Sequence, residues 1–230
     1  MARLPGVAME WMYPLLKSLV LVPLTLLPII NPLSSAPLFV ATTGGDKSVA
    51  RRLARQVAIN SWIIVVVSIL VGNYVLDIFG ISLPIVRIGG GLLVAATAWR
   101  MLESNDADGL KLAAVEKAGR LSDEEIVRRS FFPITFPLTT GPGTIAASIA
   151  LGASIPASPV LFIAGAVVAM LGALLIALVL YLVFSQAAEV LGWLGEIGTM
   201  VMMRLTAFIL LCIGIEIMWT GWAALNHITP

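Results

Sequence analysis

The residues of this chain best suited to chemistry are hydroxyl and amide side chains in two copies of one proline-rich segment. The copies are residues 28–37, PIINPLSSAP, and residues 133–142, PITFPLTTGP, and they match without a gap, with all three prolines in register. Both lie in strongly apolar surroundings. Because proline has no N–H to donate and its ring clashes with the preceding helical turn, each copy predicts a broken membrane helix. The freed backbone groups of such a break must face protein or a wet cavity.

Broken membrane helices can bind a small solute. A helix N-terminus carries roughly half a positive charge and suits a carboxylate, whereas freed carbonyls suit an ammonium group or a small cation. Glycines add room for a ligand or another backbone to approach. The candidate substrate-binding residues are Asn31, Ser34, Ser35, Thr135, Thr139, Thr140, Gly141 and Gly143.

The alternative interpretation of these residues is structural. Prolines can simply kink membrane helices, and hydroxyls can bond back to the carbonyls of their own helix. We favour binding because the segment occurs twice, and broken segments at corresponding places in two halves indicate the binding site of a transporter.

Four charged residues are candidates for coupling or charge pairing: Glu216, Lys17, Arg87 and Arg204. Glu216 lies deep in an apolar span, where a charge costs at least about 2.5–3.5 kcal/mol. It is therefore either a proton-coupling or ammonium-binding carboxylate, or part of a structural ion pair or a wet site near the surface. Lys17 is its nearest partner by predicted depth. Arg87 and Arg204 either hold a carboxylate or, as we favour, brace carbonyls or reach toward lipid headgroups.

Composition indicates an integral membrane protein and excludes several function classes. Hydrophobic residues make up 59% of the chain and charged residues 12%, against about a quarter charged in a soluble domain. The net charge of +1 gives no basis for nucleic-acid binding. Cys212 and His227 are the only cysteine and histidine, so disulfides, thiolate or histidine metal sites and a histidine relay are excluded. With no nucleophile–base pair either, we expect no enzyme and no cofactor.

Six segments are long and apolar enough to cross a bilayer, which takes about 20 residues. We place these spans near 14–40, 58–76, 83–102, 131–153, 160–184 and 199–225. The first and fourth spans contain the proline segments. By counting, both copies fall in the same half of the membrane, and we expect bent segments that meet near its midplane.

The distribution of lysine and arginine predicts the orientation. Basic residues gather in the first and third connections: Lys47, Arg51, Arg52, Arg55, Arg100, Lys111, Lys117, Arg120, Arg128 and Arg129. Both connections are expected in the cytoplasm, which puts both termini outside. Ser122–Glu125 reads as a capping box, which predicts a short helix before the fourth span.

The chain divides into a first three-span unit over 1–102, a charged cytoplasmic linker over 103–129 and a second three-span unit over 130–230. Three spans is an odd number, so the second unit enters the membrane from the opposite side. The predicted fold is an all-α membrane protein with a 3+3 inverted repeat. Gly192, Gly195 and Gly198 predict a bend before the last span.

Three sequence runs resemble the bacterial MarC family: NPLSSAPLF at 31–39, RIGGG at 87–91 and FPITFPLTTGPGT at 132–144. The resemblance covers essentially the whole chain. It implies a six-span protein of the bacterial inner membrane, related to a branch associated with the transport of small neutral amino acids. It supplies no agreed binding residues.

We therefore expect a secondary transporter for a small polar or zwitterionic solute, such as a neutral amino acid, bound between the first and fourth spans. The chain has no ATP-binding motif, so a proton or Na⁺ gradient would drive it. The alternative is a membrane scaffold or assembly protein that carries no solute. The expected partners of the transporter are the lipid bilayer and the solute, and the sequence leaves open whether the protein forms a homo-oligomer.

Overall fold

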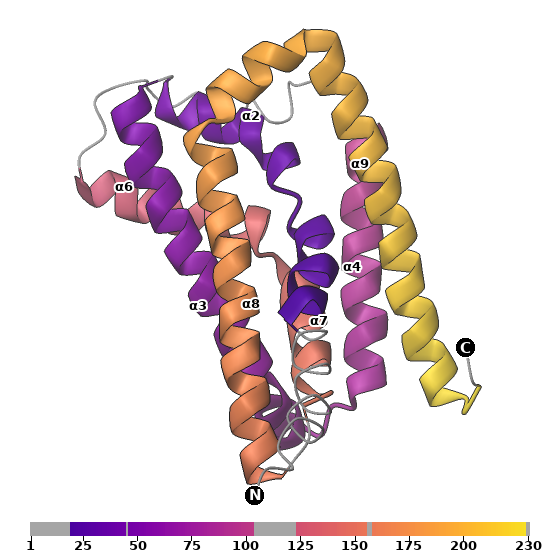
Figure 1. The fold of residues 1–230 in the computed structure, drawn as a ribbon. Coiled ribbons are helices and arrows are strands. Elements are labelled where there is room, and N and C mark those ends of the chain that lie inside the picture. Colours follow the sequence, from indigo (N-terminus) through magenta and orange to yellow (C-terminus); the bar gives the residue numbers. More distant parts are fainter. Residues whose placement is uncertain (1–18, 45, 104–122, 156–157, 229–230) are drawn as a thin grey trace, which may run out of the picture.

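The computed structural model describes residues 19–44, 46–103, 123–155 and 158–228, and the elements in these ranges are helices. Four are long: α3 (Lys47–Phe79), α4 (Leu83–Glu103), α8 (Pro159–Ser185) and α9 (Ala187–Leu225). Each of these helices contains a stretch apolar and long enough to cross a membrane. They run side by side along the length of the molecule (Figure 1).

Two bent helix pairs complete the bundle. A helix over Leu19–Ile30 meets α2 (Pro32–Thr43) at an angle of 55°. In the second pair, α6 (Asp123–Arg129) runs into the π-helix η1 (Ser130–Thr139), and this segment meets α7 (Pro142–Gly152) at 69°. If each bent pair is one span, the described chain has six membrane spans. The predicted breaks in the first and fourth spans are thus confirmed.

The two bends fall at different places in the proline segment: at Asn31 in the first span, and between Thr139 and Pro142 in the fourth. Asn31, before Pro32, has left-handed backbone angles (φ 46°, ψ 67°), and Phe136, before Pro137, is extended (φ −119°, ψ 129°). Proline disfavours helical angles in the residue that precedes it, and these two residues are non-helical at corresponding positions; Phe132, before Pro133, is extended as well. The helix then restarts with a proline in its first turn, at Pro32 in α2 and at Pro142 in α7, where a missing N–H costs nothing.

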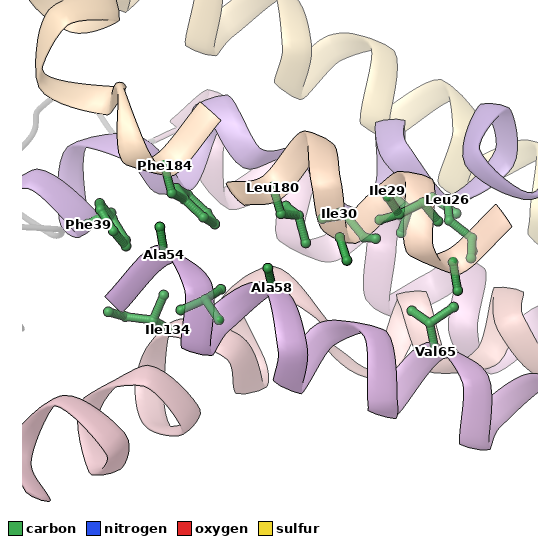
Figure 2. Packing of buried hydrophobic residues seen from close by; sticks show 14 of the residues in the cluster. Leu26, Ile29, Ile30, Phe39, Ala54, Ala58, Val65, Ile134, Leu180 and Phe184 are labelled. Atoms are coloured by element: carbon green, nitrogen blue, oxygen red, sulfur yellow. The ribbon is translucent and has the colours of Figure 1, made fainter. Parts of the chain in front are cut away.

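Helices from the two halves of the chain pack against each other. α3 packs on α8 and α4 packs on α9, while α7 contacts both α3 and α4. The interior is a hydrophobic cluster in which Ile30, Phe39, Ala58 and Phe184 come from four different helices (Figure 2). Many large apolar side chains instead point outward, as expected of surfaces that face lipid.

α4 and α9 approach each other at glycines. A Cβ on Gly91 would lie 2.6 Å from the carbonyl oxygen of Gly214, and a Cβ on Gly214 would lie 2.6 Å from the backbone nitrogen of Ala95. Such glycine contacts are typical of membrane helices that pack through small residues.

The start of the second span differs from the prediction. The sequence placed it at Ala58, whereas α3 begins at Lys47, where Asp46 caps the helix by accepting a hydrogen bond from the Ser48 N–H at 2.7 Å. The first turns of α3 are amphipathic and bury Leu53 and Ala54. The helix therefore begins before the apolar stretch does. We call the end of the bundle that carries Lys47, Arg51, Arg52 and Arg100 the basic end.

Other predictions on helix ends agree with the structure. α6 is the short helix expected before the fourth span. Gly195 has φ 68° and interrupts α9, which is the bend predicted from the glycines of this region. Most of the charged linker, residues 104–122, lies outside the described residues.

Candidate solute-binding site at the helix breaks

Asn31 caps the helix that follows the first break. Its backbone N–H donates to the Leu27 carbonyl at 2.9 Å and closes the last turn of Leu19–Ile30. Its side-chain oxygen accepts a hydrogen bond from the Ser34 N–H at 3.4 Å, and its carbonyl accepts one from the Ser34 hydroxyl at 3.0 Å. Asn31 therefore ends one helix and begins the next.

The second break is held by three threonine hydroxyls. Thr135 donates to the Ser130 carbonyl at 2.6 Å, Thr139 to the Ile134 carbonyl at 2.7 Å and Thr140 to the Thr135 carbonyl at 3.0 Å. Each bond spans five residues, the period of a π-helix. These hydroxyls satisfy carbonyls of their own segment, as the structural interpretation expects.

Gly141 and Gly143, the two glycines among the predicted site residues, allow other parts of the chain to pack closely against them. A Cβ on Gly143 would run into the side chain of Val94 on α4, and a Cβ on Gly141 would run into the Pro137 carbonyl oxygen. Both residues are half-buried. Their small size lets α7 approach α4 and lets the chain turn back on itself at the break.

Among the described residues, three buried polar atoms have no hydrogen-bond partner: Asn31 Nδ2, Ser35 Oγ and Ser61 Oγ. Asn31 is 5% exposed, and Ser35 and Ser61 are each 1% exposed. An unpartnered buried donor or acceptor costs about 1–3 kcal/mol, so such atoms indicate a place where a ligand or water can bind. Ser61 lies on α3, outside both proline segments, and the sequence reasoning missed it.

A polar chain joins α3 to the second break. Asn60 accepts a hydrogen bond from the Gln56 side chain and donates one to Ser130 Oγ, both at 3.4 Å. Ser130 donates in turn to the Val127 carbonyl at 2.7 Å. The sequence shows polar residues at 56 and 60 but not their partner, because Ser130 is 70 residues away from Asn60.

The two helices that restart at the breaks run in opposite directions. α2 leads from Asn31 toward the basic end, and α7 leads from Gly141 toward the other end (Figure 1). Their N-termini, which carry partial positive charge, therefore both face the middle of the bundle. No side chain caps the N-terminus of α7. α2 and η1 are in contact.

The site is closed in this conformation. A recess between α2 and α9, lined by Ser34, Thr199 and Thr206 among others, has a volume of about 10 Å³. A second, of about 20 Å³, lies at the basic end between Phe39, Lys47, Phe184 and Glu189. Each holds about one water molecule. A solute with several non-hydrogen atoms requires helices to move apart.

The halves of the chain are joined at the basic end. Lys47 Nζ donates to Glu189 Oε1 at 2.6 Å, and this hydrogen bond and the lysine charge hold the pKa of the Glu189 carboxyl below its ordinary value. The Glu189 carboxyl is therefore charged at neutral pH. Nearby, the rings of Phe39 and Phe184 stack with centroids 4.7 Å apart. Sequence reasoning did not identify either contact.

The described charged candidates differ in exposure. Glu216 is exposed on α9, on the side opposite Gly214, Met218 and Gly221, which face α4. Arg87 is half-buried beside Gly221 of α9, and Arg204 is exposed. Lys17, the predicted partner of Glu216, lies outside the described residues.

Comparison with known proteins identifies relatives along nearly the whole chain. The model of a family described as "MarC family integral membrane protein" matches residues 16–225. The inner membrane protein MarC of Escherichia coli (strain K12 / DH10B) is 32% identical over 216 residues, covering 91% of this chain and 96% of that protein. Its counterpart in Salmonella typhimurium (strain LT2) is 30% identical over 223 residues, with the same coverage. No solved structure matches.

Proposed function

The chain belongs to the MarC family of integral membrane proteins, and we propose that it is a secondary transporter of a small polar or zwitterionic solute, such as a neutral amino acid, in the bacterial inner membrane. The solute binds between the breaks of the first and fourth spans. Glu216 is the proposed coupling residue for a proton or Na⁺ gradient.

One observation carries the proposal. Two half-helices, α2 and α7, start at breaks inside the bundle and lead toward opposite ends of it, and Asn31 Nδ2 and Ser35 Oγ are buried at the first break without partners. Broken backbone in a membrane survives only where protein or a wet cavity satisfies it. Discontinuous helices that direct their N-termini at a midplane site are the usual construction of a transporter's binding site.

We further propose that the two halves are inverted repeats with both termini outside. The matching proline segments support this, as do the contacts of α3 with α8 and of α4 with α9, because each contact pairs elements at corresponding places in the two halves. With the basic end in the cytoplasm, the contacts of Lys47 with Glu189 and of Phe39 with Phe184 close the cytoplasmic side. Transport then requires one half to rock against the other.

The test is solute uptake into vesicles that contain the purified protein, combined with a thermal-stability screen of neutral amino acids and other small polar solutes. A ligand that binds the folded state raises its melting temperature, and a transported one accumulates when a proton or Na⁺ gradient is imposed. Asn31→Gly should abolish both effects. Glu216→Gln should keep the stabilisation and lose the gradient dependence; unchanged gradient-driven uptake in that variant would remove Glu216 from the coupling.

A scaffold that carries no solute is the second candidate. The hydroxyls of Thr135, Thr139 and Thr140 favour it, because all three bond to backbone carbonyls of their own segment. A scaffold predicts no solute flux and full tolerance of the double substitution Ser34→Ala with Thr139→Ala. Absence of both flux and solute stabilisation in the wild-type protein would decide for the scaffold.

A further inference from the structure

Ser61 is a buried polar residue whose hydroxyl makes no hydrogen bond that would stabilise the fold. It lies in the middle of α3, it is 1% exposed, and its hydroxyl has no partner. A serine in a membrane helix ordinarily bonds to a carbonyl one turn earlier, as Ser148 does by donating to the Thr144 carbonyl at 2.7 Å. The Ser61 hydroxyl is therefore available to a ligand.

Ser61 lies at the level of the first break. It comes three residues after Ala58 and four before Val65, which places all three on one face of α3. Figure 2 shows Ala58 and Val65 directed toward the part of the core that contains Ile30 and Leu26, and the four residues belong to one packed cluster. Ile30 immediately precedes Asn31 in the chain.

Ser35 lies in the same region. It precedes Phe39 by one turn of α2, and Figure 2 shows Phe39 beside Ala54 of α3, one turn before Ala58. Asn31, Ser35 and Ser61 each lie within one helical turn of Ile30, Phe39 or Ala58, which belong to one packed cluster, and each has an unpartnered atom. They come from the first break itself, from the helix that follows it and from α3.

The chemistry of these atoms points to an acceptor. The Asn31 side-chain oxygen already accepts a hydrogen bond from the Ser34 N–H, so the remaining group, Nδ2, can only donate. The two serine hydroxyls are also able to donate. The N-terminus of α2 adds roughly half a positive charge, which favours a ligand with a negative charge.

We propose that Ser61, together with Asn31 and Ser35, binds the carboxylate of the transported solute. This inference rests on the proposed transport function and extends it, because it assigns the anionic end of the solute to this place and adds a residue from α3. The ligand class is a small molecule with one carboxylate, and loss of that group should remove most of the binding.

The test compares two pairs of probes: L-alanine with L-alaninamide, and L-serine with L-serinamide. The amides keep the ammonium group and the side chain and lack the carboxylate. Dissociation constants are measured by calorimetry on the purified full-length protein and its variants. We expect an amino acid to bind the wild type at least about tenfold more tightly than its amide, the difference that a hydrogen-bonded charged group supplies.

Ser61→Ala and Ser148→Ala form the matched variants, since both serines are fully buried and only Ser148 has a partner. Ser61→Ala should weaken amino-acid binding about tenfold and leave amide binding unchanged. Its ligand-free melting temperature should stay the same or rise, because the change removes a polar atom that is costly to bury unpaired. Ser148→Ala should bind as the wild type does.

Equal binding of amino acid and amide, or no binding of either amino acid to the wild type, would overturn the carboxylate assignment. Unchanged affinity in Ser61→Ala would remove Ser61 from the site. The uptake and stability screen of other polar solutes decides separately whether the transport proposal stands, so the two failures are distinguishable.

Discussion

At the scale of single residues, Asn31 has two roles that can be separated. It adopts left-handed backbone angles and caps α2, and it buries an unpartnered side-chain nitrogen. Asparagine tolerates left-handed angles better than other residues with a Cβ. The backbone angles and the cap stabilise the broken span, whereas the unpartnered nitrogen is available to a ligand.

Two substitutions of Asn31 separate these roles. Asn31→Gly keeps the left-handed angles and should cost only a few tenths of a kcal/mol as a cap. Asn31→Ala should destabilise by about 2–3 kcal/mol, since alanine adds about 1–2 kcal/mol of backbone strain to about 1 kcal/mol of lost capping. Thermal unfolding in detergent measures the difference. Equal loss of stability in both variants would contradict the left-handed geometry at Asn31.

At the scale of elements, the firmest contact between the halves is the packing of α4 on α9. Gly91 meets backbone atoms of α9, with the Gly214 oxygen and the Met218 nitrogen 2.6 and 2.7 Å from an added Cβ. Backbone atoms cannot move aside as a flexible side chain can. A Cβ added to Gly89, two residues earlier, would meet no atom within 4 Å.

A methyl group added at these two glycines should have opposite effects. Gly91→Ala forces α4 and α9 apart and should destabilise by about 1–3 kcal/mol, the usual cost of overpacking. Gly89→Ala is the control and should be neutral or stabilising by up to about 1 kcal/mol, because alanine is the better helix former. The measurement is again thermal unfolding in detergent. A stable Gly91→Ala variant would be inconsistent with the close crossing of these helices.

At the scale of the whole molecule, the structure is closed at the basic end. Lys47 and Glu189 are 142 residues apart in the chain, and with the stacked Phe39 and Phe184 they tie α2 and α3 to α8 and α9. The Lys47–Glu189 pair is exposed, and surface pairs of this kind contribute little to stability. A weak, water-accessible contact of this kind suits the closure that the proposed transport would open in each cycle.

Locking this contact should stop transport. Cys212 is the only cysteine, so Cys212→Ser provides a background in which Lys47→Cys and Glu189→Cys can be joined by a short bis-thiosulfonate reagent. Uptake should fall to background after joining and return after reduction. Lys47→Cys with Arg51→Cys is the control, because both residues lie on α3. Full uptake by the joined Lys47–Glu189 variant would show either that the basic end stays closed throughout transport or that the Lys47–Glu189 contact is not a gate.

The sequence by itself determined the membrane class, the number of candidate spans and the positions of the breaks. The breaks fall in the proline-rich segments, where proline disfavours helical angles in the residue before it, as at Asn31 and Phe136. The predicted site residues Asn31 and Ser35 follow from the same segment. The start of α3 was missed because hydropathy measures the apolar stretch, and an amphipathic helix can extend beyond it.

Only the tertiary structure decided which polar groups have partners. Ser35 and Thr140 occupy equivalent places in the two proline segments, yet the Thr140 hydroxyl is bonded and the Ser35 hydroxyl is not. Ser61 belongs to no motif, and Glu216, prominent in the sequence, lies on an exposed face of α9. Burial and hydrogen bonding depend on neighbours brought together from distant parts of the chain, and the pattern along one helix does not contain that information.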